Sequence, residues 1–293
     1  MIGNQAPAVA PASVRPLSPA EFLHFQRLIC DASGIFLPES KLALLSARVG
    51  RRVRELGFRD FPGYRRHVIE RGEEEMAQLL DCVCTNETHF FREPKQFEFL
   101  EQRVFPARME AAREGRGPKR IRVWSAGCAT GEEAYSIAMT MAASLPPDWE
   151  RTILATDLST RALAVARQAE WRIEKASEIP RQYRERFMLR GVRRAEGRMR
   201  ARDEIRSMIE LARVNLSRDE RLFGGPFDLI FCRNVLIYFS REARAAAIDR
   251  LLRHLAPGGL LFLGHAESLA AGAHAVRAVG PTAYMRAGEA ELA

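Results

Sequence analysis

The sequence has no long apolar run and no pattern typical of an export signal. No stretch approaches about 18 consecutive apolar residues, the length that a transmembrane helix needs. Residues 1–16 are rich in proline and carry a single basic residue, Arg15, so they lack the charged and then apolar order of a signal peptide. We interpret residues 1–16 as a flexible leader and expect a cytoplasmic protein that does not insert into a membrane.

Cysteine is scarce, and of the five cysteines only Cys82 and Cys84 form a close pair. No second pair or nearby histidine cluster could complete a zinc site, so we predict no bound metal and reduced thiols. The rest of the composition is ordinary for a globular protein, with 47% hydrophobic and 28% charged residues. The formal net charge of +8 fits an anionic partner, whether nucleic acid, a membrane surface or an acidic protein.

Before about residue 80 the pattern is helical. Ser18, Pro19 and Glu21 have the spacing of a capping box, which predicts a helix over residues 19–32. A second helix is predicted over residues 39–56, because apolar residues recur there at spacings of three and four. The other faces of this second helix carry Lys41, Arg48, Arg51, Arg52 and Arg54. These arginines are either a solvated helix face or a docking surface on a helical domain over residues 17–80.

From about residue 120 strands and helices alternate, which indicates an α/β domain with a mostly parallel sheet. The predicted strands are 121–126, 152–157, 228–233 and 259–265, and the predicted helices are 132–144, 160–169 and 241–255. Short arginine-rich runs separated by Gly191 and Gly197 predict a small antiparallel β insertion over about residues 180–213. The tail resembles a hairpin around Gly280 and Pro281.

The segment WSAGCATGEEAYSIAM reads as a strand, a glycine turn and the start of a helix. Gly127 and Gly131 would let the backbone approach a ligand, and the helix would offer free N–H groups. The turn lacks the GK[ST] ending of a phosphate-binding loop, which argues against ATP or GTP hydrolysis. Glu132 and Glu133 would repel a triphosphate and attract a cation such as the ammonium and sulfonium of S-adenosylmethionine, although acids also stabilise a helix start without binding anything.

Asp157 ends the second predicted strand, where an open α/β sheet commonly places an acid that accepts hydrogen bonds from ribose hydroxyls. The same residue could instead cap the following helix. Turn and acid together favour a nucleoside-binding site.

Six ordered segments make the chain similar to the CheR family of chemotaxis receptor glutamate methyltransferases, from about residue 17 to 290. They are TNETHFFRE (85–93), WSAGCATGEEAYSIAM (124–139), LATDLS (154–159), ARVNL (212–216), GPFDLIFCRNVLIYF (225–239) and LAPGGLLFLGHAES (255–268). The resemblance implies a small all-α domain ahead of a class I Rossmann-like methyltransferase domain over residues 81–293. It also implies S-adenosylmethionine as cofactor and S-adenosylhomocysteine as product.

The resemblance assigns roles to individual residues. By it, the residues that would contact the cofactor or border the methyl-transfer site are Asn86, Thr88 and Arg92. Further cofactor contacts would come from Asp157, Asn215, Leu216, Arg233 and Asn234, beside Gly127 of the glycine turn. Glu132 would bind the amino-acid end of the cofactor, with Glu133 as the alternative. Tyr238 would lie close to the transferred methyl group. Arg92 is the candidate for orienting the incoming carboxylate, with cofactor contact as the alternative role. Structural alternatives remain for Asn86 as a helix cap, for Leu216 as a core residue and for Tyr238 as a buried aromatic.

The implied reaction is methyl esterification of glutamate side chains on the cytoplasmic helical bundle of a chemoreceptor. A carboxylate is ionised near pH 7, so no general base is needed. The arginines Arg48, Arg51, Arg52 and Arg54 would face the acidic bundle, and a receptor C-terminal peptide could add to the β insertion. We expect a monomer.

Two other functions fit parts of the sequence. A nucleic-acid methyltransferase would suit the net charge, but CRNVLIYF lacks the NPPY-type pocket motif of enzymes that methylate base nitrogens. A regulatory module that binds the cofactor without turnover is the other alternative. We favour the receptor methyltransferase and predict no nucleic-acid partner.

Overall fold

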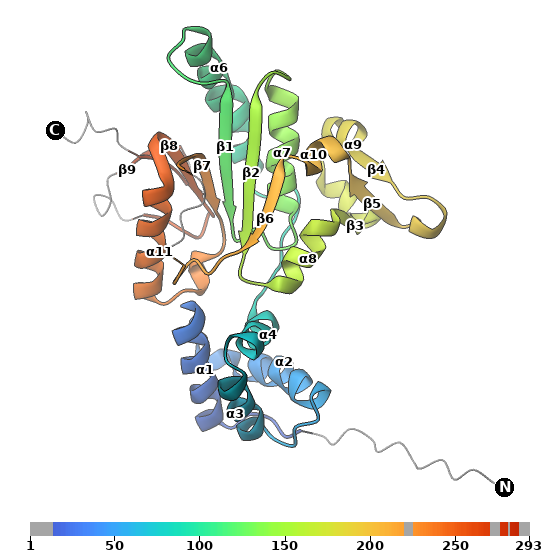
Figure 1. Cartoon of the computed structure of the whole chain (residues 1–293), viewed down its shortest axis with the longest axis vertical. Helices are drawn as coiled ribbons and strands as arrows, with labels where there is room; N and C mark the ends of the chain where they lie inside the picture. Colours follow the sequence, from blue (N-terminus) through green and yellow to red (C-terminus); the bar gives the residue numbers. More distant parts are fainter. Residues whose placement is uncertain (1–13, 220–224, 270–275, 281, 287–293) are drawn as a thin grey trace. The chain divides into compact units, whose positions relative to one another are not determined.

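The computed structural model describes residues 14–219, 225–269, 276–280 and 282–286. The chain divides into two compact units, one ending at Cys84 and the other beginning at Thr85 (Figure 1). Most of the proposed leader, residues 1–13, lies outside the described residues, as does Pro281. Among the helices of the described ranges, none is long and apolar enough to cross a membrane.

The N-terminal unit is all helical. Its elements are α1 (Pro19–Ser33), η1 (Glu39–Lys41), α2 (Leu42–Glu55), α3 (Phe61–Arg71) and α4 (Glu73–Val83). The capping box is confirmed, because the Ser18 hydroxyl accepts from the Glu21 backbone N–H and the Glu21 carboxylate accepts from the Ser18 N–H. The predicted apolar stripe of α2 is buried through Leu45, Val49 and Val53. Tertiary burial of one face therefore holds these short helices in place.

The second unit is built on a sheet of seven strands in the order β6-β2-β1-β7-β8-β10-β9. They are β1 (Arg120–Ala126), β2 (Glu150–Asp157), β6 (Ile209–Arg213), β7 (Phe227–Cys232), β8 (Leu255–Leu263), β9 (Val276–Gly280) and β10 (Ala283–Arg286). The strands from β6 to β8 are parallel, and β10 and β9 add the antiparallel tail hairpin predicted from the sequence. The order reverses between β1 and β7, and ligands of open α/β sheets bind at the carboxyl ends of strands beside such a reversal.

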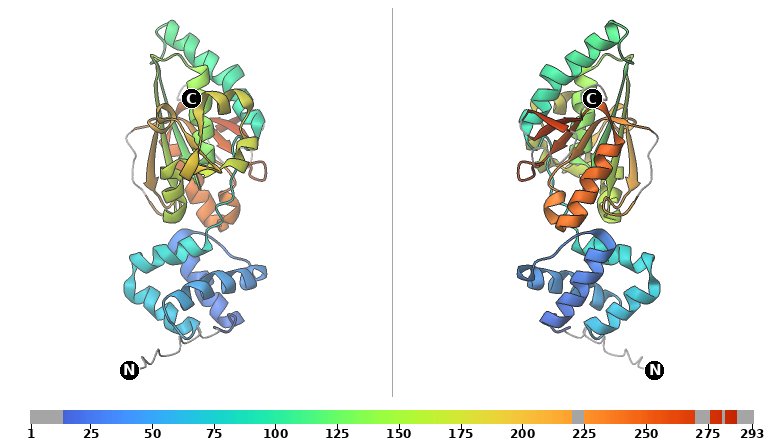
Figure 2. Two further views of the ribbon diagram at one scale, coloured as in Figure 1. Left: turned by 90° about the vertical axis from the view of Figure 1, so that its right-hand side faces the viewer. Right: turned by 90° about the vertical axis from the view of Figure 1, so that its left-hand side faces the viewer.

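Helices cover both faces of this sheet. They are α5 (Pro94–Phe99), the π-helical turn η2 (Leu100–Val104), α6 (Phe105–Arg113), α7 (Glu132–Ser144), α8 (Thr160–Gln168), α9 (Arg181–Phe187), α10 (Asp203–Arg206) and α11 (Arg241–His254). Val123 packs with α5 to α8, whereas its neighbour Trp124 packs against α11 on the other face. Successive side chains of a strand point to opposite faces, so β1 is apolar on both. Figure 2 shows the chain turned by 90° to either side, with α11 in orange.

The antiparallel insertion exists, but its predicted bounds were wrong. Its sheet has three strands in the order β3-β5-β4, namely β3 (Glu170–Arg172), β4 (Met188–Arg190) and β5 (Arg198–Ala201) (Figure 1). It thus begins at Glu170 rather than near residue 180, because a three-residue strand is too short to show an alternating pattern. At the other end, Ile209–Arg213 pairs in parallel with β2 and belongs to the main sheet. Between the small strands lie η3 (Ile173–Glu178) and η4 (Arg193–Ala195).

Candidate functional site

The glycine turn after β1 lies at the carboxyl end of the sheet, as predicted. Gly127 has φ +92° and Gly131 has φ +100°, a region that glycine adopts without strain. A Cβ on Gly127 would lie 2.4 Å from a methyl group of Val235, and a Cβ on Gly131 would lie 3.0 Å from that of Ala166. Backbone conformation and internal packing therefore require both glycines, independently of any ligand.

Asp157, at the end of β2, ties this turn to the neighbouring strand. One carboxylate oxygen accepts from the Ala129 N–H at 2.8 Å, and the other accepts from the Ser159 N–H at 2.8 Å. The Ser159 hydroxyl caps α8 and also lies 3.3 Å from the Asn86 side-chain nitrogen. Asp157 and Asn86 are thus brought close together, and Asn86 caps no helix.

The two glutamates at the start of α7 have different surroundings. The Glu132 side chain is fully buried and is bonded to the Thr130 hydroxyl and to the Lys175 ammonium, both at 2.6 Å. The Glu133 carboxylate instead accepts from the Ser125 hydroxyl at 2.7 Å and lies 3.6 Å from Arg233 Nη1. Burial raises the pKa of Glu133, and the positive charge of Arg233 opposes that shift. Both glutamates therefore have a cationic neighbour, and the longer contact of Glu133, 3.6 Å against 2.6 Å, leaves it the better placed of the two to receive a cation.

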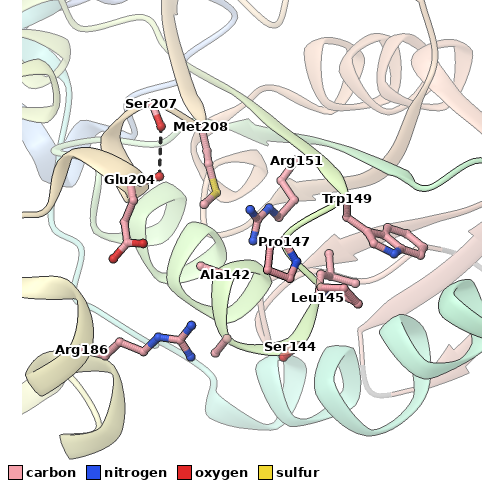
Figure 3. A pocket seen from close by; sticks show the side chains of 12 residues that line it. Ala142, Ser144, Leu145, Pro147, Trp149, Arg151, Arg186, Glu204, Ser207 and Met208 are labelled. Atoms are coloured by element: carbon pink, nitrogen blue, oxygen red, sulfur yellow. Dashed lines mark hydrogen bonds between the residues drawn. The ribbon is translucent and has the colours of Figure 1, made fainter.

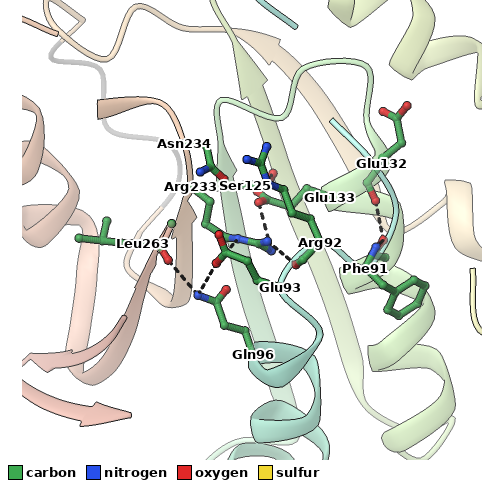
Figure 4. Close-up of polar contacts among 12 residues, drawn as sticks. Phe91, Arg92, Glu93, Gln96, Ser125, Glu132, Glu133, Arg233, Asn234 and Leu263 are labelled. Atoms are coloured by element: carbon green, nitrogen blue, oxygen red, sulfur yellow. Dashed lines mark hydrogen bonds and ion pairs between the residues drawn. The ribbon is translucent and has the colours of Figure 1, made fainter. Parts of the chain in front are cut away.

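Arg233, which follows β7, is the centre of this polar cluster (Figure 4). Its side chain is 1% exposed and lies 3.6 Å from the Glu93 and Glu133 carboxylates, and it also donates to the Arg92 carbonyl. In the described residues Arg233 Nε and Nη1 and Asn234 Oδ1 are buried without a hydrogen-bond partner. Buried donors and acceptors of this kind normally have partners, so a ligand with both an anionic and a cationic end fits here.

Sequence reasoning missed Glu267, which fixes the turn after β7. Its buried carboxylate accepts from the backbone N–H groups of Asn234, Leu236 and Gly264, each at 2.8 Å. Asn234 has φ +58°, an uncommon conformation that these bonds stabilise. Glu267 lies within the segment GHAES that carried the family resemblance, but no local pattern shows that two of its three partners are backbone groups more than 30 residues earlier.

The remaining predicted residues lie around this cluster. Asn86, Thr88 and Arg92 are half-buried in the irregular segment 85–93, and Tyr238 lies in η5 (Leu236–Tyr238) with 40% of its surface exposed. The alternative of a buried aromatic at position 238 was therefore wrong. Near the end of β6, the Asn215 side chain accepts from the Ser217 N–H at 3.1 Å. Leu216 is 5% exposed, and its carbonyl accepts from Arg250.

The predicted docking arginines of α2 divide into two pairs. Arg51 and Arg54 are exposed. Arg48 donates to the carbonyl of Val83 at 2.6 Å, which satisfies the end of α4. Arg52 forms a two-pronged ion pair with the buried Glu75 at 2.8 and 2.9 Å. Arg48 and Arg52 therefore support the folded unit, a division that helical spacing does not reveal.

A separate hollow of about 730 Å³ lies near the amino end of β2 (Figure 3). It is lined by Trp149, Arg151, Arg186, Glu204 and Met208, among others, and by none of the predicted site residues. Within the described ranges no group of three or more His, Cys, Asp and Glu side chains could hold a metal ion. The predicted site residues lie elsewhere, around the polar cluster at the carboxyl edge of the sheet.

The fold and this polar cluster define a class I, Rossmann-like methyltransferase that uses S-adenosylmethionine. Comparison with protein families agrees: residues 86–285 match the CheR methyltransferase, SAM binding domain, and residues 20–84 match the CheR methyltransferase, all-alpha domain. The chain belongs to the CheR methyltransferase family.

Curated relatives match over most of their length. Chemotaxis protein methyltransferase 2 of Pseudomonas aeruginosa is 35% identical over 265 residues, covering 90% of this chain and 92% of the relative. The chemotaxis protein methyltransferase of Escherichia coli is 37% identical over 257 residues, covering 86% of this chain and 85% of the relative.

Proposed function

We propose that this protein transfers a methyl group from S-adenosylmethionine to glutamate side chains in the cytoplasmic helical bundle of a chemoreceptor. The observation that carries the proposal is the set of buried polar atoms of Arg233 and Asn234 that lack a hydrogen-bond partner, next to Glu133. These groups match the carboxylate and the ammonium at the amino-acid end of the cofactor. The relatives' names as chemotaxis methyltransferases support the receptor as substrate.

Arg233 would donate to the cofactor carboxylate, and Glu133 with Asn234 Oδ1 would accept from its ammonium. Asp157 would accept from the ribose, while Asn215 and Leu216 would border the adenine. Asn86, Thr88 and the backbone of Gly127 would line the same cleft. We thus assign the acid at the amino-acid end to Glu133, because its contact with Arg233 is longer, at 3.6 Å, than the 2.6 Å contact of Glu132 with Lys175.

The bound cofactor supplies a methyl group on a cationic sulfur. A carboxylate oxygen of the receptor glutamate forms the new C–O bond, and the electrons of the breaking C–S bond stay on sulfur, so no proton moves. The protein's contribution is to align the reacting atoms and to exclude water from the attacking carboxylate. Arg92 would orient this carboxylate, and the exposed Tyr238 would border the path along which it approaches.

His89, next to these residues, fits this mechanism as a neutral group. Burial and the nearby charge of Arg92 lower the pKa of His89, which favours its neutral form.

The product chemistry tests the proposal directly. The purified protein, a receptor cytoplasmic fragment and S-adenosylmethionine labelled in the methyl group should yield labelled receptor. The label should be released as methanol by mild alkali, because esters hydrolyse and methylated amines do not. Alkali-stable label, label on RNA instead of receptor, or no transfer would contradict the proposal.

We further propose that the receptor bundle docks on the exposed stripe of α2. Leu44, Ala47, Arg51 and Arg54 are exposed at spacings of three and four, so they share one face. Two guanidinium groups beside apolar surface suit an acidic helix, and their attraction should weaken as salt rises. Arg48 and Arg52 are not part of this proposed contact, because both are partly buried and bonded to α4, whereas Arg51 pairs with the exposed Glu55 of its own helix.

Charge reversal separates docking from folding. The double variant Arg51→Glu and Arg54→Glu should lower receptor methylation at low salt and leave S-adenosylhomocysteine affinity unchanged. The matched control is Arg66→Glu with Arg71→Glu, exposed on α3, which changes the net charge by the same amount. Equal methylation by both double variants would rule out the stripe.

The small sheet offers a second place for the receptor, by addition of a C-terminal peptide to β4. Strand β4 pairs with β5 on one side only, and Leu189 and Val192 beside that edge are 44% and 71% exposed. Gly191 donates to Arg198, so by alternation the N–H of Arg190 points to the open edge. Arg190→Pro should therefore abolish binding of a receptor tail peptide, whereas Arg190→Ala should retain it. Equal binding by both variants would exclude strand addition here.

We propose that the enzyme acts as a cytoplasmic monomer.

A further inference from the structure

The segment 85–93 carries three of the proposed site residues but forms no helix or strand of its own. It contains two non-glycine residues with positive φ, Phe91 at +51° and Glu93 at +59°. Such conformations are unfavourable and persist only where the surroundings enforce them. Because the segment has no backbone ladder, side chains from elsewhere must hold it.

Two of the side chains that hold the segment 85–93 come from η3. The Lys175 ammonium donates to the Thr88 carbonyl at 2.9 Å, and a Glu178 carboxylate oxygen accepts from the Phe90 N–H at 2.9 Å. A third side chain comes from α7, where the Ser136 hydroxyl accepts from the Phe91 N–H at 2.9 Å. Consecutive residues of the segment are thus bonded to η3 and α7.

Lys175 is itself fixed to the rigid part of the site. Its ammonium lies 2.6 Å from the carboxylate of Glu132, whose side chain is completely buried in the first turn of α7. One ammonium group therefore joins α7 to the Thr88 carbonyl. It also neutralises Glu132, whereas Glu133 lies at the longer distance of 3.6 Å from its cation, Arg233.

We infer that Lys175 and Glu178 are positioning residues for methyl transfer, which rests on the proposed function. They act through the segment 85–93 by keeping Asn86, Thr88 and Arg92 directed at the cofactor and the incoming carboxylate. The helical turn η3 follows β3 directly, and the Ile173 N–H donates to the Gly197 carbonyl at 2.9 Å. The small insertion therefore holds η3, and through η3 it helps to position the segment 85–93.

Paired substitutions test this inference. Lys175→Met and Glu178→Ala remove the bonds to the segment, whereas Lys175→Arg can still donate and Glu178→Gln can still accept. Arg181→Gln is the control, since Arg181 is exposed and its ion pair with Glu185 lies within α9. The affinity for S-adenosylhomocysteine by calorimetry, the KM for S-adenosylmethionine, kcat and hydrogen exchange of the Phe90 and Phe91 amides are measured for each.

Misplacing reacting groups by about 1 Å can cost about 100-fold in rate, so partial release of the segment should cost about tenfold in affinity and in kcat/KM. We expect that loss in Lys175→Met and Glu178→Ala, with faster exchange at Phe90, and values within about twofold of wild type in the conservative variants and the control.

Wild-type affinity in both Lys175→Met and Glu178→Ala, even with lowered thermal stability, would overturn the inference. An equal loss in Arg181→Gln would do the same. If Lys175→Met does not fold, the Glu178 pair decides the question. Binding of S-adenosylhomocysteine needs no receptor, so a wild-type protein that binds it without methylating a receptor would contradict the proposed function and leave this comparison intact.

Discussion

Replacing Arg52 with alanine should lower the stability of the N-terminal unit more than replacing any exposed arginine of α2 does. Arg52 donates twice to Glu75, at 2.9 and 2.8 Å, and the Tyr64 hydroxyl donates to the same carboxylate at 2.9 Å. The side chains of Glu75 and Arg52 are 6% and 19% exposed. Burial acts to raise the pKa of Glu75, but the hydrogen bonds from Arg52 and Tyr64 hold it below its usual value.

The magnitude follows from leaving Glu75 buried without its cation. Removing one partner of a buried ion pair costs about 3–5 kcal/mol, and the partial exposure of Arg52 places the expected loss near the lower end, at about 3 kcal/mol. Tyr64→Phe removes one hydrogen bond to a charged acceptor and should cost about 2 kcal/mol. Arg51→Ala, which breaks an exposed pair with Glu55, should change stability by no more than about 0.5 kcal/mol.

Urea unfolding can assign this loss to one unit. Trp124, Trp149 and Trp171 are the only tryptophans, and all lie beyond Thr85, so their fluorescence follows the second unit. Arg52→Ala should shift the helical signal in circular dichroism to lower urea and leave the fluorescence transition in place. Equal stability of Arg52→Ala and Arg51→Ala would refute the reasoning.

The stability of the N-terminal unit should decrease at acidic pH because of Glu75. Since the folded state lowers the pKa of Glu75 below its ordinary value of 4.5, its stabilising contribution is complete above that pH and is lost as the pH falls through the folded pKa.

Three further outcomes follow from the site. Arg92→Ala and Tyr238→Phe should reduce kcat more than S-adenosylhomocysteine affinity, and unchanged turnover in both would remove them from the mechanism. Glu267→Ala should destabilise the second unit by about 3 kcal/mol, because three backbone N–H groups lose their acceptor; a loss below about 1 kcal/mol in urea unfolding would contradict that role. Because burial raises the pKa of Glu133, cofactor affinity should increase with pH above 4.5 as this carboxyl ionises. In calorimetry, Glu133→Gln should bind the cofactor more weakly and with a flatter pH dependence. The same slope of affinity against pH in both proteins would argue against Glu133.

The repeating patterns of the sequence predicted most of the architecture. The stripe of α2, the capping box at Ser18 and the strand, turn and helix around Gly127 all formed where local spacing indicated. Each of these signals depends on residues a few positions apart. The helices from Pro94 to Arg113 were not predicted, since α5 and α6 are short and joined through a π-helical turn.

What the sequence left open depends on contacts between distant segments. Glu132 and Glu133 look alike in sequence, yet one turns to Lys175, 43 residues later, and the other to Arg233. The helical pattern alone allows Arg52 to be a solvated residue, because its partner Glu75 is 23 residues away in the sequence. The anchoring of segment 85–93 by η3 has no local signature either.

The most direct test of the central claim is a calorimetric titration of the purified wild-type chain and of Arg233→Met with S-adenosylmethionine and S-adenosylhomocysteine. The account predicts saturable binding of both compounds by the wild type and a loss of at least tenfold in affinity for the variant, as expected when a charge-assisted contact worth about 1.5–3 kcal/mol is removed. Absence of binding to the wild type, or equal binding by Arg233→Met, would contradict it.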